Sequence, residues 1–249
     1  MEVHAHTHIP TSRKKKWTHY FWEFLMLFLA VFCGFLAEYQ LEHKIEKERG
    51  MQYIRSFYND LKTDTTEFSR LISWNEEKLA VLEKRNDCYD SLPLQLKAFN
   101  PCIVELMNHA SGFPDLVNAD QTLLQLKNAG GLRLIKQVDA DSILAYDRMI
   151  RDYIKSETTG LQESQYRLRE LINSLINYKN LKLKKEDPSV PFLVDDMTTV
   201  NKFFVMLDSY YYTCRNMTRT LRRIKQRATD LIEHFNDKYH LSEGTPLKK

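Results

Sequence analysis

The feature that most constrains this chain is an apolar segment near its N-terminus, residues 20–37, with the sequence YFWEFLMLFLAVFCGFLA. The segment holds a single charged residue, Glu23, and no proline. A bilayer core about 30 Å thick is crossed by roughly 20 helical residues. Residues 20–39 supply that length if Glu23 lies among the lipid headgroups. We therefore predict a membrane-spanning helix over residues 17–39.

An uncleaved anchor fits this segment better than a signal peptide does. A cleavable signal has a shorter apolar core, and it ends in small residues at the cleavage site. Here Phe35 stands where a small residue is needed. A lipoprotein signal would require a small residue before Cys33, but Phe32 is there.

The charges on either side of the segment predict its orientation. Four basic residues, 13–16, precede it, whereas Lys44, Lys47 and Arg49 follow it among several glutamates. The positive-inside rule counts Lys and Arg near the ends of a span. It favours a single-pass protein of the cell membrane, with a cytoplasmic N-terminus and a helical domain outside the cytoplasm.

Small residues form one face of the predicted span. Ala30, Gly34 and Ala37 follow the i, i+4, i+7 spacing, which lets two membrane helices approach closely. This face is a candidate surface for transmembrane helix packing. The alternative is that small residues are simply common in membrane helices.

The remaining chain has the composition of a helical domain. Its 249 residues include only 7 Gly and 7 Pro, which suits long helices rather than a many-turned β fold. The formal net charge of +3 gives no overall basic bias towards nucleic acid. We predict a basic tail at 1–16, the anchor at 17–39, a helical bundle domain at 40–241 and a flexible tail at 242–249.

Apolar periodicity predicts three long helices with short helical inserts between the first two. The first helix continues from the span to about Asp87, with Asn75 interrupting its apolar row and Gly50 as a weak point. Short helices are expected from Pro101 to about His109 and over 118–127. A second long helix runs over about 139–183, weakened at 158–160.

The last helix carries the clearest pattern in the chain. Its apolar residues alternate steps of three and four over five heptads, which is typical of the a/d seam of a bundle. Thr198 or Thr199 can cap its start. The seam comprises Val200, Phe203, Leu207, Tyr210, Cys214, Met217, Leu221, Ile224, Ala228, Leu231 and Phe235. The predicted fold is all-α: an N-terminal transmembrane helix that continues into an antiparallel bundle of three long helices.

Part of the chain resembles a group of uncharacterised bacterial single-pass membrane proteins. The opening KKWTHYFWEFLMLFLAVFCGFLAEYQLEHKIEKER, then YIRSFYNDLKTD at 53–64 and LQLKNAGGLRLI at 124–135, is similar to that group. The resemblance covers roughly residues 14–75 and 120–155. It implies a membrane anchor and a helical soluble domain, and it implies no activity.

The cysteines form neither a zinc motif nor a disulfide framework. Cys33 lies in the span, and the other three, Cys88, Cys102 and Cys214, are an odd number without a CxxC pair. Cys88 and Cys102 flank one irregular segment and could pair if the domain is exported. Buried free thiols are the favoured interpretation.

A basic run in the last helix is the candidate surface for a partner. Arg215, Arg219, Arg222 and Arg223 belong to a stretch without an intervening acid, which could meet anionic lipid, an acidic partner or, if the domain is cytoplasmic, nucleic acid. The alternative, which we favour at this stage, is that these side chains pair with acids of the other long helices, such as Glu163 or Glu170.

The remaining candidate sites favour structural roles. Consecutive tyrosines at 210–212 could stack on a ligand, but packing against neighbouring helices is the simpler expectation. The alternating histidines at 4, 6 and 8 lack a Cys or carboxylate that would complete a metal site. Glu105 and His109 lie near Cys102 without a third, orienting group for nucleophilic catalysis.

These patterns predict a membrane-anchored, non-enzymatic interaction domain: a scaffold, assembly factor or accessory protein. We expect no cofactor, no metal and no nucleic acid as partners. The expected partners are the lipid bilayer and another protein, or a second copy of the chain. The alternative function is a sensory or small-ligand-binding bundle coupled to the membrane helix, which needs a polar-lined site between helices.

Overall fold

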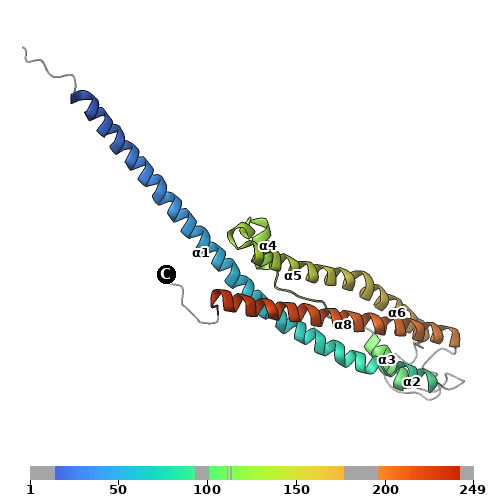
Figure 1. Cartoon of the computed structure of the whole chain (residues 1–249). Helices are drawn as coiled ribbons and strands as arrows, with labels where there is room; N and C mark the ends of the chain where they lie inside the picture. Colours follow the sequence, from blue (N-terminus) through green and yellow to red (C-terminus); the bar gives the residue numbers. More distant parts are fainter. Residues whose placement is uncertain (1–14, 93–100, 111, 113, 177–195, 242–249) are drawn as a thin grey trace, which may run out of the picture. The chain divides into compact units, whose positions relative to one another are not determined.

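The computed structural model describes residues 15–92, 101–110, 112, 114–176 and 196–241. Every regular element in these ranges is helical, so the predicted all-α class is confirmed there (Figure 1). The chain divides into two compact units, Met1–Met51 and Gln52–Lys249. The histidines at 4, 6 and 8, residues 1–14 of the predicted basic tail and the whole predicted tail at 242–249 lie outside the described residues, whereas Lys15 and Lys16 already belong to a helix.

The first helix, α1 (Lys15–Leu82), contributes to both units. It continues through Gly50, which does not interrupt it, and ends earlier than the predicted Asp87. A turn at Glu83 and Lys84 separates it from α2 (Arg85–Asp90).

Two short helices follow at the predicted places. The helix α3 (Pro101–Ala110) begins at a proline, whose fixed φ suits the first turn of a helix. The helix α4 (Gln121–Asn128) starts three residues later than the predicted 118. After it, Gly130 adopts a left-handed conformation with φ 66°, which ends α4 before a 3-10 turn, η1 (Gly131–Leu134).

The second long helical segment is interrupted where its sequence is weak. It consists of α5 (Gln137–Ser156), a π-helical turn η2 (Glu157–Leu161) and α6 (Gln162–Leu175). The π turn coincides with the predicted weak stretch at 158–160. The predicted continuation to 183 lies beyond the described residues.

The last helix, α8 (Met197–Tyr239), buries every residue of its predicted seam. Its N-cap is Asp196, whose carboxylate accepts a hydrogen bond from the Thr198 backbone N–H at 3.0 Å. The expectation that Thr198 or Thr199 would cap the helix is therefore wrong. Asp is among the best N-cap residues because its short carboxylate reaches the free N–H groups of the first turn.

The core of the unit Gln52–Lys249 consists of two apolar clusters rather than one. The first, which we call the α3–α6 cluster, joins Leu82 at the end of α1 with α2, α3, α6 and the first half of α8. The second, the α4–α5 cluster, joins residues 54–71 of α1 with α4, α5 and the second half of α8. Burial of these faces is the main stabilising contribution to such helices.

Candidate functional site

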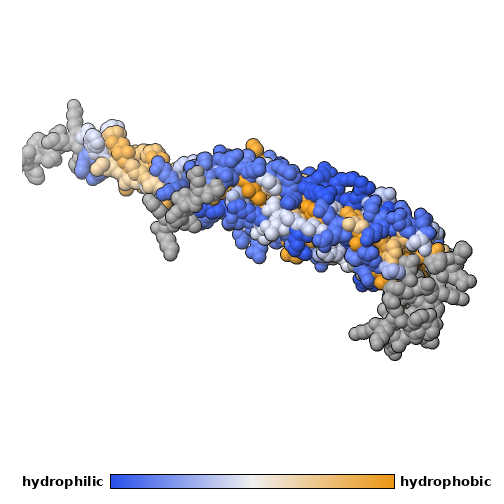
Figure 2. All heavy atoms as spheres, turned by 90° about the horizontal axis from the view of Figure 1, so that it is seen from below, coloured by the Kyte–Doolittle hydropathy of each residue, from blue (hydrophilic) through white to orange (hydrophobic). Residues whose placement is uncertain are grey.

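Within the part of the chain that the structure describes, one helix is long and apolar enough to cross a membrane, and it lies near the N-terminus. The apolar segment of this helix is exposed on all sides: Val31 within it is 68% exposed, and Trp17 just before it is 82% exposed. Figure 2 shows the corresponding run of apolar surface on the N-terminal part of α1.

The small-residue face of this segment is open. Ala30, Gly34 and Ala37 are all exposed, and a Cβ added at Gly34 would meet no atom within 4 Å. The bulky side chains stack instead along the helix: the Phe28 ring lies 6.2 Å from that of Phe24 and 5.9 Å from that of Phe32, centroid to centroid.

The structure separates the predicted arginines into two groups. Arg222 donates to the carboxylate of Glu76 in α1 at 2.5 Å, so it links two long helices. The expectation that these arginines pair with acids of the other long helices thus holds for Arg222, although its partner is Glu76 rather than Glu163 or Glu170. The exposed Glu163 pairs within α6, with Arg167.

The other three arginines, Arg215, Arg219 and Arg223, are exposed and make no ion pair with any described residue. They lie one helical turn apart, so they share one side of α8. Two exposed apolar residues continue the same line at seven-residue spacing: Val205 is 64% exposed and Tyr212 is 48% exposed. We call this surface, residues Val205, Tyr212, Arg215, Arg219 and Arg223, the outer face of α8.

The three consecutive tyrosines do not form a common platform. Tyr210 is fully buried, and its hydroxyl bonds the Lys78 ammonium. Tyr211 is buried against the Arg85 guanidinium, which lies 3.9 Å from its ring centroid, and donates its hydroxyl to Glu83. Only Tyr212 reaches solvent. The expectation of packing therefore holds for the first two.

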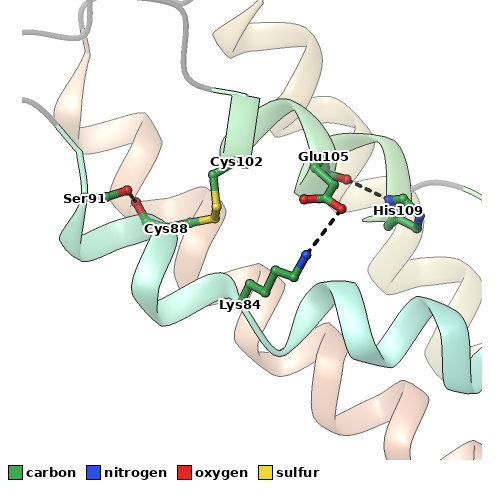
Figure 3. The surroundings of a disulfide bond; sticks show 6 residues. All are labelled: Lys84, Cys88, Ser91, Cys102, Glu105 and His109. Atoms are coloured by element: carbon green, nitrogen blue, oxygen red, sulfur yellow. Dashed lines mark hydrogen bonds and ion pairs between the residues drawn. A yellow bond between two sulfur atoms is a disulfide. The ribbon is translucent and has the colours of Figure 1, made fainter.

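The sequence interpretation of Cys88 and Cys102 as free thiols is wrong, because the two residues form a disulfide between α2 and α3 (Figure 3). Their Cα atoms are 5.7 Å apart, within the range that a disulfide spans. Sequence reasoning gave this pair only as the alternative for an exported domain, because nothing in the spacing shows that α3 folds back onto α2. Cys214 is a free, buried thiol.

Because Cys102 is bonded in the disulfide, it offers no free thiol as a nucleophile beside Glu105 and His109 (Figure 3). His109 Nδ1 lies 2.9 Å from the backbone carbonyl of Glu105, and the Glu105 carboxylate lies 3.6 Å from the Lys84 ammonium. The first contact lies within α3, and the second joins α3 to the turn between α1 and α2. Among the described residues, no group of three or more His, Cys, Asp or Glu could hold a metal ion.

A layer of polar residues lies where the two apolar clusters meet, and sequence reasoning did not anticipate it. Each long helical segment contributes buried polar side chains at this level, and three of them, Tyr153, Tyr210 and Cys214, also belong to the clusters. The layer comprises Asn75 and Lys78 of α1, Tyr153 of α5, Glu157 of η2, and Tyr210, Cys214 and Thr218 of α8. We call these residues the central polar layer.

Lys78 and Tyr210 bond to each other in the central polar layer, and each has further partners. The Lys78 ammonium donates to the Gly112 carbonyl at 2.6 Å and to the Tyr210 hydroxyl, and it lies 4.9 Å from the centroid of the Trp74 ring. Gln165 of α6 also donates to the Tyr210 hydroxyl, at 3.2 Å. Burial lowers the pKa of Lys78 to about 8.

Two further buried carboxylates differ in how they are held. Burial raises the pKa of Asp64 to about 6, although Ala119 N–H and the Tyr146 hydroxyl both donate to it at 2.7 Å. Asp139 is also fully buried, but its hydrogen bonds from Lys238, Tyr239 and His234 outweigh the cost of burial and leave its pKa below the usual value.

No family model, no curated protein sequence and no solved structure matches this chain.

Proposed function

We propose that this protein is a membrane-anchored, non-enzymatic interaction domain that binds a partner protein through the outer face of α8. The observation that carries the proposal is that face itself. Three arginines without an ion pair among the described residues lie beside two exposed apolar side chains on one side of a helix whose other side is fully packed.

The proposed architecture is an anchor followed by an antiparallel bundle of three long helices. The core clusters support this arrangement. The end of α1 packs with the first half of α8, and the earlier residues 54–71 of α1 pack with its second half. In this arrangement α8 runs opposite to α1 and to α5–α6, and it presents its outer face along the bundle.

The proposed topology places the bundle outside the cytoplasm. Two independent features support it. The basic residues 13–16 precede the apolar segment and favour a cytoplasmic N-terminus. The Cys88–Cys102 disulfide is typical of an oxidising compartment, because cytosolic thiols are kept reduced. An exported bundle has envelope or surface proteins, rather than nucleic acid, as available partners.

The chemistry of the outer face indicates what it binds. Arginine and tyrosine are enriched at the centres of protein interfaces, where the guanidinium pairs with carboxylates and the ring supplies apolar contact. An acidic helical segment, with small apolar residues opposite Val205 and Tyr212, would complement both parts of the face. Self-association remains a variant of the same proposal, with a second copy as the partner.

Photocrosslinking in the intact membrane tests this proposal. A photoreactive amino acid placed at Tyr212 should give a discrete adduct, because Tyr212 lies on the outer face and is exposed. The double charge reversal R219E/R223E should abolish the adduct while helicity, followed by circular dichroism, stays unchanged. Loss of helicity would instead mean that these arginines are structural.

The control is R169E, which reverses the charge of one exposed arginine of α6. It should leave the adduct intact. An adduct that survives R219E/R223E, or that R169E removes equally well, would contradict binding through the outer face of α8.

A sensory domain is the second candidate function, and the central polar layer is the observation in its favour. A ligand-binding bundle needs a few polar groups between its helices. Asn75, Lys78 and Tyr153 are such groups, and they come from two different helices.

A further inference from the structure

The central polar layer contains polar atoms without a partner among the described residues. Asn75 is fully buried, and neither its amide nitrogen nor its amide oxygen has a hydrogen-bond partner. Tyr153 is 1% exposed, and its hydroxyl also lacks a partner. Buried polar groups in native proteins are nearly always bonded to the protein or to ordered water.

The charged groups of the layer are incompletely neutralised as well. The Lys78 ammonium donates to Gly112 and to Tyr210, which are neutral acceptors, and it pairs with no carboxylate of a described residue. Glu157 is 5% exposed and has no ion pair with a described residue. Burial raises the pKa of Glu157 to about 7, and the negative charge of Asp115 acts in the same direction.

The backbone is irregular at the same level of the bundle. Glu157 begins the π turn η2, which lies between α5 and α6. Single π turns inside helices are rare and often occur at functional sites, since they shift side chains out of the regular helical order. Glu157 follows Tyr153 by four residues, about one helical turn, so the two side chains face the same interior layer.

We propose that the central polar layer is a hydration site, in which water molecules bond the Asn75 amide and the Tyr153 hydroxyl and solvate Lys78 and Glu157. Water is the ligand that fits this set, because the layer offers both donors and acceptors, and a buried water commonly makes about three hydrogen bonds to such groups. Asn75 alone supplies an amide donor and a carbonyl acceptor.

The hydration site explains why the core is divided. The α3–α6 cluster and the α4–α5 cluster are made of buried apolar residues, whereas the layer where they meet keeps buried polar atoms without a hydrogen-bond partner among the described residues. The bundle therefore has an internal wet layer at mid-length. This inference does not depend on the outer face of α8 or on its partner.

Hydroxyl-radical footprinting of the full chain in detergent tests the proposal. Radicals produced from bound water label neighbouring side chains even when these are buried. Tyr153 should be labelled several-fold faster than Tyr146, which is equally buried but donates its hydroxyl to Asp64. Equal protection of the two tyrosines would overturn the hydration site.

Thermal unfolding of Tyr153→Phe gives an independent readout. In a hydrated layer the variant loses a hydrogen bond to water, so its midpoint should fall, as it should in the control Tyr146→Phe. In a dry layer the change removes an unsatisfied buried hydroxyl, so the midpoint should rise. A rise for Tyr153→Phe alone would contradict the proposal.

Discussion

Asp64 illustrates, at the scale of single residues, how burial changes an ionisable side chain. It is 2% exposed and accepts hydrogen bonds from the Ala119 N–H and the Tyr146 hydroxyl. Burial has the larger effect and raises its pKa to about 6, with the nearby charges of Asp60 and Asp120 acting in the same direction. The folded protein therefore holds this proton at a pH where the unfolded chain has lost it.

Stability should fall as the pH rises from about 4 to about 6, because the folded state binds the Asp64 proton more tightly than the unfolded state. A shift of about two pKa units corresponds to about 3 kcal/mol. Asp64→Asn should make this slope shallower, with the part due to Glu157, whose pKa is raised to about 7, left in place, and it should be the more stable protein at pH 7. Urea unfolding at several pH values measures both effects.

The control for this prediction is Asp152→Asn, at an exposed position of α5. It should keep the wild-type slope. If Asp64→Asn showed the full wild-type dependence of stability on pH, the Asp64 carboxyl would not be the group that causes it.

At the scale of elements, α8 has one face that holds the core and one that is open. Leu207 is fully buried in the seam, whereas Val205, two residues earlier, is 64% exposed. Truncating Leu207 therefore removes packed contacts, whereas truncating Val205 removes solvent-exposed surface.

Leu207→Ala should lower the free energy of unfolding by about 2–5 kcal/mol, because it leaves a cavity in the α3–α6 cluster. Val205→Ala should change it by no more than about 0.5 kcal/mol. Chemical denaturation of both variants gives the comparison. A similar loss for both would mean that Val205 is packed rather than exposed.

The sequence predicts such helices well and the polar interior poorly. All seam residues of α8 are buried as the three–four spacing indicates, because that spacing directly reports a helix face. Asn75 was visible only as an interruption of the apolar row. Lys78 and Glu157 are residue types that are usually exposed, so a single sequence gives no sign that they are buried.

The Cys88–Cys102 pair shows the same limit for contacts between elements. The pairing depends on how α3 packs against α2, and sequence separation does not report that geometry. Likewise, the ion pair of Arg222 with Glu76 depends on how α1 and α8 are arranged. In the sequence, Arg219, Arg222 and Arg223 belong to the same basic run, so the sequence does not show which of them is paired.

At the scale of the whole molecule, we propose a membrane anchor followed by an exported helical domain. The apolar segment, the basic residues before it and the disulfide each bear on this claim. The compartment decides whether the disulfide persists and which partners the outer face of α8 can meet.

The most direct test is a topology reporter that is active only outside the cytoplasm, fused after Lys249 and compared with the same reporter fused before Met1. The account predicts activity for the C-terminal fusion and none for the N-terminal fusion. An inactive C-terminal fusion with an active N-terminal one would contradict it, since the domain would then lie in a reducing compartment where neither the disulfide nor the proposed partners are expected.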